Sequence, residues 1–157
     1  MHSTIPPARK PMSGGYMPSK ANLHRYAGMA ALVVDDDEFL RKALTRQLAL
    51  LGIGRVAEAG GGERACRALM AQGPFDLVTC DLSMPGLDGM KLLAELAAIQ
   101  PSIGVLLVTG MPRESIEAAE QQARALRLNL LGSLRKPVQL RELDQLMQRS
   151  HVAPAAG

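Results

Sequence analysis

Four short apolar runs of this chain each lead directly to residues with reactive or charged side chains. They lead in turn to Asp35-Asp36-Asp37, to Asp81, to Thr109 and to Lys136-Pro137. If the runs are strands of one parallel sheet, these residues lie along the same edge, where ligands of open α/β sheets bind. Carboxylates, a hydroxyl and an ammonium gathered at one edge predict a magnesium-dependent phosphoryl site.

Each of these residues also has an ordinary structural interpretation. The three aspartates could begin a helix, where acids favour the helix dipole, and Asp37 could cap it. Asp81 could be a solvated loop acid, and a threonine or a Lys-Pro pair is common at a strand end. The order and the shared strand-end placement of all four, rather than any one of them, carry the prediction of a site.

The chain alternates strands with helices, which predicts an α/β fold with a parallel sheet covered on both faces. The apolar runs predict strands over residues 30–34, 54–58, 76–80, 103–108 and 128–134. Apolar residues at helical spacing predict helices over 37–51, 61–72, 88–99, 113–127 and from 137 onward. A turn at Met84-Pro85-Gly86 follows the third strand.

The composition divides the chain into a leader, one domain and a tail. Residues 1–28 are rich in Pro, Ser, Gly and Lys and are expected to be disordered, residues 29–150 form the domain, and residues 151–157 form a flexible tail. Four of the 18 basic residues precede residue 29 with no acid among them, whereas the other 14 and all 15 acidic residues follow. A basic leader can touch nucleic acid or anionic lipid, but four charges spread over 28 residues are a weak signal, so we expect no direct binding to nucleic acid or to a membrane.

Cysteine and histidine usage excludes several classes of protein. Cys66 and Cys80 are too few for a disulfide framework, which fits a reduced, cytoplasmic setting. His2, His24 and His151 all lie in the expected leader and tail, which argues against a histidine-based triad, a histidine-ligated zinc site and a phosphohistidine carrier. No run approaches the roughly 18 apolar residues of a membrane span.

Residues 30–149 resemble a response-regulator receiver domain of two-component signalling. The resemblance rests on the stretches LVVDDDEFLRKAL, FDLVTCDLSMPGLDG, VLLVTG and GSLRKP. It implies a flavodoxin-like (βα)5 three-layer sandwich with strand order 2-1-3-4-5. The stretch over 112–130, together with LRLNLLGSLRKPVQL, is also similar to receivers that precede EAL-type cyclic-di-GMP phosphodiesterase domains.

The resemblance implies a phosphoacceptor and a metal site. Asp81 would be the carboxylate nucleophile that takes phosphate from a histidine kinase or a phosphotransfer protein. Asp35 and Asp36 match the family's acidic pair, and together with Asp81 they would hold Mg²⁺. The backbone carbonyl of Ser83 would be a further ligand of the metal.

The resemblance also assigns the other two strand-end residues, and it departs from the family at one place. Thr109 would hydrogen-bond the phosphoryl group and Lys136 would pair with it. The Lys136-Pro137 peptide is often cis in the family. Many receivers carry an aromatic residue where this chain has Ser133, so its output is expected to depend on backbone shifts or on dimerisation.

The resemblance implies a phosphorylation-dependent switch that accepts phosphate and does not otherwise act as an enzyme. Phosphate on Asp81 would change a surface around helix 113–127, the fifth strand and the last helix. A downstream protein, a fused output domain or a second copy would read this surface.

Two alternatives stay open at this point. One is a haloacid-dehalogenase-like phosphatase, which the Asp-x-Asp pattern within residues 35–37 would fit. Against it, Phe39 stands where Thr or Val is expected, and Asp81 would have no role. The other alternative is a receiver-like interaction module that takes no phosphate.

Overall fold

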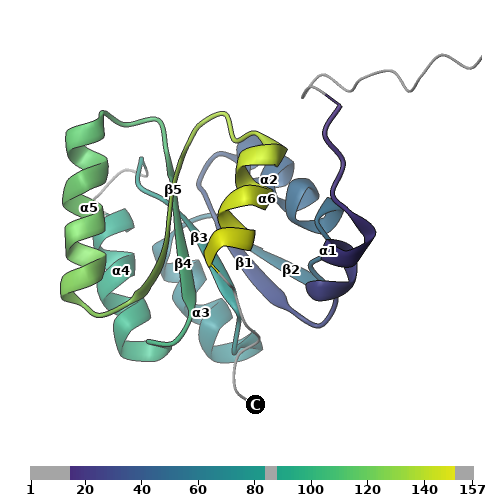
Figure 1. Cartoon of the computed structure of the whole chain (residues 1–157). Coiled ribbons are helices and arrows are strands. Elements are labelled where there is room, and N and C mark those ends of the chain that lie inside the picture. The colour runs from purple at the N-terminus through teal and green to yellow at the C-terminus, as the bar shows by residue number, and fades with distance from the viewer. Residues whose placement is uncertain (1–14, 84–87, 151–157) are drawn as a thin grey trace, which may run out of the picture.

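The computed structural model describes residues 15–83 and 88–150, and this part of the chain forms one parallel sheet flanked by helices (Figure 1). The strand order is β2-β1-β3-β4-β5, which confirms the expected flavodoxin-like topology. The strands are β1 (Ala30–Val34), β2 (Arg55–Ala59), β3 (Leu77–Asp81), β4 (Gly104–Thr109) and β5 (Asn129–Arg135).

Burial along the strands follows their place in the sheet. Every residue of the three central strands β1, β3 and β4 is buried, whereas β2 and β5 at the edges are partly exposed. The central strands are covered on both faces, and for this reason their sequences are continuous apolar runs without alternation.

The helices cover the two faces unequally. α2 (Glu38–Leu50) and α6 (Leu140–Ser150) pack on one face, and α3 (Gly62–Gln72), α4 (Asp88–Ile99) and α5 (Arg113–Ala125) pack on the other. The apolar core is therefore split into two layers by the sheet. The carboxyl ends of the strands and the loops that follow them carry the strand-end residues.

Local residues define the two ends of α2. Asp37 caps the first turn, because its side chain accepts a hydrogen bond of 3.1 Å from the backbone N–H of Leu40. After the last turn, Gly52 has a φ of 101°, in the left-handed region that glycine adopts without strain.

The last helix begins later than expected. It starts at Leu140 instead of residue 137. The carbonyl of Val138 accepts a hydrogen bond of 2.8 Å from Nε2 of Gln47 on α2, which holds this residue in the loop before the helix. The turn expected at Met84-Pro85-Gly86 lies outside the described residues.

The expectation of a disordered leader is wrong for residues 15–28. These residues include a short helix, α1 (Lys20–Arg25), which lies beside α2 and α6 (Figure 1). Tyr26 is fully buried and Tyr16 packs against the same apolar layer. Two aromatic anchors order a segment whose composition indicated disorder. The remaining bounds of leader, domain and tail stay predictions.

No helix in the part of the chain that the structure describes is long and apolar enough to cross a lipid bilayer.

Candidate functional site

The four strand-end residues meet at the carboxyl edge of the sheet, as predicted. Asp35 follows β1, Asp81 is the last residue of β3, Thr109 is the last residue of β4, and Lys136 follows β5. Their strands are neighbours in the sheet. Only 3% of Asp35, 2% of Asp81 and none of Thr109 is exposed, so the group is recessed below the surface.

Lys136 is paired with two carboxylates at once. Its Nζ lies 3.1 Å from Oδ2 of Asp35 and 3.1 Å from Oδ2 of Asp81. Burial alone would lower the pKa of this ammonium, but the hydrogen bond to Asp35 and the charge of Asp81 outweigh burial and raise the pKa above its usual value. The side chain therefore stays charged between the two acids. The Lys136-Pro137 peptide is cis.

Three carboxylates converge on one point. Asp35, Asp36 and Asp81 each offer an oxygen, and these oxygens lie within 4.8 Å of one another. Burial raises the pKa of Asp35, and the nearby charge of Asp81 raises it further. Like charges at this separation favour a cation. A donor set made only of carboxylate oxygens suits a hard divalent ion such as Mg²⁺.

The backbone fixes one oxygen of each buried carboxylate. Oδ1 of Asp81 accepts a hydrogen bond of 2.8 Å from the N–H of Ser83, and Oδ1 of Asp35 accepts one of 2.9 Å from the N–H of Asp37. Among the described residues, Nζ of Lys136 at 3.1 Å is the one group paired with the buried Oδ2 of Asp81, and no other donor reaches this oxygen. A buried oxygen in this state is suited to bind an additional ligand.

The hydroxyl of Thr109 is held in place by two contacts that the sequence did not indicate. Oγ1 accepts a hydrogen bond of 3.0 Å from the backbone N–H of Met111 and lies 3.0 Å from Oγ of Ser83. The carbonyl of Thr109 also accepts a hydrogen bond of 3.0 Å from the N–H of Lys136. The loops after β3, β4 and β5 are thus joined directly at this edge.

Arg41 supports the site from α2. Its Nη1 donates a hydrogen bond of 2.9 Å to the carbonyl of Asp35, and its Nε donates one of 3.0 Å to Glu58 on β2. Glu58 is partly buried, yet the hydrogen bonds from Arg41 and Lys42 lower its pKa. Arg41 therefore fixes the loop that carries Asp35 and Asp36. Its role depends on contacts between elements, which local sequence patterns do not indicate.

Ser133 makes a polar contact between β5 and α5. Its hydroxyl donates a hydrogen bond of 2.7 Å to Oε2 of Glu120. Nearby, Nη1 of Arg135 donates one of 3.1 Å to the carbonyl of Met111, in the same loop that holds Thr109. These residues adjoin a cavity of about 250 Å³ lined by Arg113, Ile116, Glu117, Glu120, Ser133 and Arg135.

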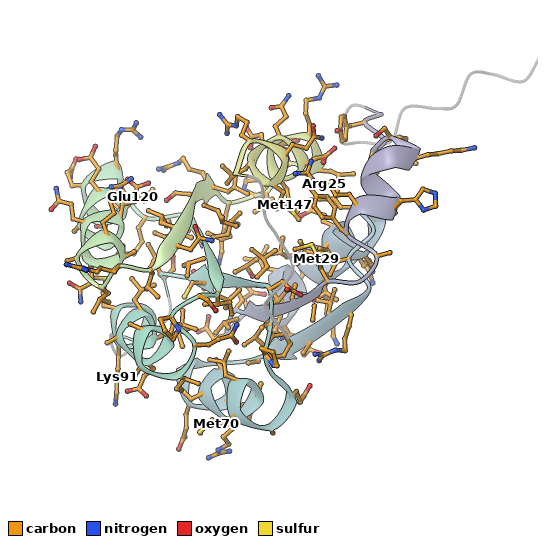
Figure 2. The ribbon with its side chains drawn as sticks, turned by 60° about the horizontal axis from the view of Figure 1, so that its bottom comes forward. Arg25, Met29, Met70, Lys91, Glu120 and Met147 are labelled. Atoms are coloured by element: carbon orange, nitrogen blue, oxygen red, sulfur yellow. The ribbon has the colours of Figure 1, made fainter. Side chains whose placement is uncertain are left out.

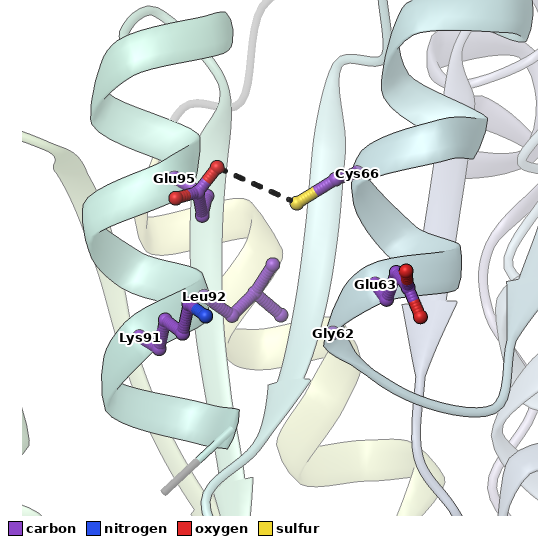
Figure 3. A pocket seen from close by; sticks show the side chains of 6 residues that line it. All are labelled: Gly62, Glu63, Cys66, Lys91, Leu92 and Glu95. Carbon is purple, nitrogen blue, oxygen red and sulfur yellow. Dashed lines mark hydrogen bonds between the residues drawn. The ribbon is translucent and has the colours of Figure 1, made fainter.

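A larger cavity of about 540 Å³ lies between α3 and α4, away from the aspartates (Figure 3). Sγ of Cys66 faces Glu95 there, at 3.9 Å from Oε2. Burial raises the pKa of the Cys66 thiol, and the charge of Glu95 raises it further. The thiol is therefore protonated at neutral pH and is a poor nucleophile. This cavity shares no residue with the strand-end group.

The sequence profile of the response regulator receiver domain matches residues 31–148. The chain belongs to the response regulator receiver family. This receiver domain is 30% identical over 118 residues to the cyclic di-GMP phosphodiesterase RocR of Pseudomonas aeruginosa, covering 75% of this chain and 30% of that protein. It is 34% identical over 126 residues to the response regulator protein FleR of the same species, covering 80% and 25%. The receiver domain thus spans about a third or less of these relatives.

Solved structures agree with the family. A response regulator receiver domain protein from Clostridium thermocellum superposes with a TM-score of 0.66 at 25% identity, covering 78% of this chain and 94% of that one. A response regulator from Colwellia psychrerythraea gives a TM-score of 0.65 at 23% identity, covering 78% and 97%. The family assignment leaves the phosphatase alternative without support. The similarity to RocR agrees with the second resemblance, to receivers of cyclic-di-GMP phosphodiesterases.

Proposed function

We propose that this receiver domain is a signalling switch that accepts a phosphoryl group on Asp81 from a histidine kinase or a phosphotransfer protein. The observation that supports this best is the convergence of the carboxylate oxygens of Asp35, Asp36 and Asp81 within 4.8 Å, with the ammonium of Lys136 at 3.1 Å from two of these carboxylates. Phosphoryl transfer needs positioning and neutralisation of charge more than covalent chemistry from the protein.

In this proposal the carboxylate of Asp81 is the nucleophile. A carboxylate oxygen forms a bond to phosphorus, the bond from phosphorus to the donor's nitrogen breaks, and the departing imidazole keeps the electron pair and takes up a proton from water. The product is an acyl phosphate. The hydrogen bond from the N–H of Ser83 to Oδ1 orients the carboxylate before the reaction.

A metal would be held by Asp35, Asp36, Asp81 and the backbone carbonyl of Ser83. Mg²⁺, when bound, supplies positive charge that reduces repulsion between the carboxylates and the incoming phosphoryl oxygens. Burying the two carboxylates of Asp35 and Asp81 side by side is energetically unfavourable without a cation. This arrangement is therefore consistent with a functional metal site.

Lys136 and Thr109 complete the site. The ammonium of Lys136 bridges Asp35 and Asp81 before the reaction, and it would turn to a phosphoryl oxygen once Asp81 is modified. The hydroxyl of Thr109 would donate a hydrogen bond to another phosphoryl oxygen. Its contact with Oγ of Ser83 can persist only with Ser83 as the donor, so the arrival of phosphate is expected to fix the direction of this hydrogen bond between the loops after β3 and β4.

The donor protein is expected to dock beside α2. Phe39 is 80% exposed although it is aromatic. It borders a small, mostly apolar cavity of about 140 Å³ that also includes Pro137, Val138 and the site residues Asp35 and Lys136. An exposed ring next to the reacting carboxylate suits an apolar surface of a partner that must bring its phosphorylated side chain to Asp81.

The output surface in this proposal consists of α5, β5 and α6. Ser133 replaces an aromatic side chain here, and its hydrogen bond to Glu120 joins β5 to α5. Arg135 joins β5 to the loop of Met111, which carries the contact to Thr109. A shift of that loop can therefore reach α5 through polar contacts. A downstream protein, a fused output domain or a second copy would bind the changed surface.

The test is labelling with a small acyl-phosphate donor, read by intact mass, with and without Mg²⁺. We expect a mass gain of one phosphoryl group on the wild type with Mg²⁺, little without Mg²⁺, and none on Asp81→Asn. Asp37→Asn is the matched control, because Asp37 caps α2 and lies outside the carboxylate cluster.

Each other outcome has a defined meaning. A folded wild type that is never labelled by any donor, phosphorylated histidine included, would support the interaction module that takes no phosphate. Labelling that persists in Asp81→Asn would place the phosphate on another residue and refute the proposal.

A further inference from the structure

Residues 15–28, called the strap from here on, are packed against the domain although they precede the segment that defines the family. The family match begins at residue 31. The strap contains α1 and lies beside α2 and α6, as both views of the molecule show (Figures 1 and 2). Met147 of α6 and Met29, both labelled in Figure 2, belong to the same apolar layer as Tyr26 of the strap.

The strap is anchored in the core by Tyr26. This side chain is fully buried and belongs to the apolar layer that also contains Leu48 of α2 and Met147 of α6. Among the described residues its hydroxyl has no hydrogen-bond partner. Burying an unpaired hydroxyl opposes docking, so the apolar ring and other contacts must supply the stabilisation.

Tyr16 supplies a second anchor on α6. Its hydroxyl donates a hydrogen bond to Oδ2 of Asp144, a carboxylate that is itself fully buried. The guanidinium of Arg141 lies over the ring of Tyr16, 5.3 Å from its centroid. A hydrogen bond to a charged acceptor is stronger than one between neutral groups. Asp144 also accepts a hydrogen bond of 2.9 Å from Gln148, so its other oxygen is satisfied.

The backbone of the strap also touches the sheet directly. A Cβ added at Gly54, just before β2, would overlap the carbonyl oxygen of Ala27. A Cβ added at Gly28 would meet nothing within 4 Å. The backbone of the strap is therefore in close contact with the start of β2 at Ala27 and is open to solvent at Gly28. This close contact indicates that the strap packs against the domain.

We propose that the strap is an intramolecular cover of the joint surface of α2 and α6, latched by the hydrogen bond between Tyr16 and Asp144. While it is seated, no other polypeptide can use this side of α6. The inference goes beyond the proposed function, because it concerns the contacts of the strap with α2 and α6 and needs no phosphate, although α6 also belongs to the output surface proposed above. Its occupant is this chain's own residues 15–28.

The chain offers an optical reporter of the latch. Tyr16 and Tyr26 are its only tyrosines, and it has no tryptophan. Tyrosine fluorescence of the whole protein therefore reports on the strap alone. A phenol that is hydrogen-bonded to a carboxylate is quenched, so lifting the strap is expected to raise the emission.

The first experiment measures how often the strap lifts. Trypsin cleaves after Arg25 only when α1 leaves the domain, so the full-length protein should be cut there far more slowly than a peptide of residues 15–28. Tyr16→Phe removes the hydrogen bond to Asp144 and keeps the aromatic ring. We expect trypsin to cleave this variant after Arg25 about tenfold faster than the wild type. Tyr26→Phe is the matched control and should leave the rate unchanged or lower it.

Backbone contact gives a second pair of variants. Gly54→Ala should speed cleavage after Arg25 because the new Cβ displaces the strap at Ala27, whereas Gly28→Ala should not. A wild type that is cut after Arg25 as fast as the free peptide would overturn the proposal. So would a rate that is the same in Tyr16→Phe, Gly54→Ala and the wild type.

A competition experiment tests the cover itself. In the full-length double variant Tyr16→Ala/Tyr26→Ala the strap loses both anchors. A dye-labelled wild-type peptide of residues 15–28 is added to this variant and to the wild type, and its binding is measured by fluorescence anisotropy. We expect this peptide to bind the double variant and to bind the wild type at least tenfold more weakly, because the attached strap competes at a high effective concentration. Equal binding to both proteins, or binding to neither while the far-ultraviolet circular dichroism is native, would refute the cover.

Discussion

The ammonium of Lys136 and the carboxylate of Asp81 are paired across 3.1 Å between Nζ and Oδ2. The same ammonium is 3.1 Å from Oδ2 of Asp35. All three side chains are largely buried, with 17%, 2% and 5% of their side-chain surfaces exposed. In the absence of a metal, Lys136 is thus the cation that lies between the two buried acids.

Replacing Lys136 with Met should destabilise the metal-free protein. Losing the cation that pairs with both buried carboxylates should lower the free energy of unfolding by about 3 kcal/mol, as when a buried ion pair loses one partner. With Mg²⁺ the loss should be smaller, because the metal takes over the charge. Urea unfolding in both buffers measures the difference. Lys42→Met, an exposed partner of Glu58, is the control and should cost under about 1 kcal/mol. An equal loss for Lys136→Met in both buffers would argue against a metal at this place.

Mg²⁺ should stabilise the wild type against heat. A ligand that binds only the folded state adds about 1.4 kcal/mol at ten times its Kd. Asp36→Asn removes an exposed carboxylate of the cluster and should abolish most of this gain, whereas Asp37→Asn should keep it, since Asn also caps helices. Thermal midpoints with and without Mg²⁺ decide the matter. A gain that survives unchanged in Asp36→Asn would mean that the ion binds elsewhere.

The contact between Ser133 and Glu120 should control how firmly α5 is held. Glu120→Ala breaks the hydrogen bond of 2.7 Å, and we expect amide exchange in α5 to become roughly tenfold faster. Labelling of Asp81 should be unchanged, since neither residue lies in the site. Glu117→Ala removes only an exposed pair with Arg113 and serves as the comparison. Exchange that is the same in both variants would show that the contact does not restrain α5.

Ionisation of Tyr16 should release the strap at high pH. Burial raises the pKa of Tyr16 to about 12, and the hydrogen bond to Asp144 adds to the shift. Because the folded state favours the neutral phenol, the stabilisation is complete below a pH of about 10, the ordinary pKa of tyrosine, and is lost as the pH rises toward 12. Tyrosinate absorbance of Tyr26→Phe, which has Tyr16 alone, gives the midpoint. In that background Asp144→Asn should bring the midpoint closer to 10. A midpoint of about 10 both with and without Asp144→Asn would contradict the hydrogen bond between Tyr16 and Asp144.

Gly132 should be intolerant of a side chain. It has a φ of 150°, and an added Cβ would lie 2.7 Å from Cδ1 of Leu146 on α6. We expect Gly132→Ala to lower the free energy of unfolding by about 1–3 kcal/mol through strain and crowding. Gly110→Ala, where a Cβ would meet nothing within 4 Å, should change it by less than about 0.5 kcal/mol. Urea midpoints of the two variants provide the comparison.

Much of the fold and of the site could be predicted from local patterns. The strands are short apolar runs, and parallel strands bring their ends to one edge, so the meeting of Asp35, Asp81, Thr109 and Lys136 followed from their placement alone. Burial of these strands on both faces produced the continuous runs that made them visible.

The parts that escaped prediction depend on contacts between distant elements. Tyr16 meets Asp144 across 128 positions of the sequence, so nothing near Tyr16 indicates that the strap is ordered. Arg41 reaches the carbonyl of Asp35 from α2, and an arginine on a helix usually points to solvent. The late start of α6 follows from the hydrogen bond that Gln47 donates to the carbonyl of Val138, and the spacing of apolar residues does not predict this contact.

The irregularity opposite Gly132 has a consequence for how two copies could meet. The register between β4 and β5 shifts at Val105 and Leu106, and β5 is the outermost strand on its side of the sheet. A bulged border strand is a poor template for pairing with another chain, which guards against open-ended fibre growth. We therefore expect any assembly on this flank to be a closed pair built from helix surfaces, one that does not lengthen the sheet.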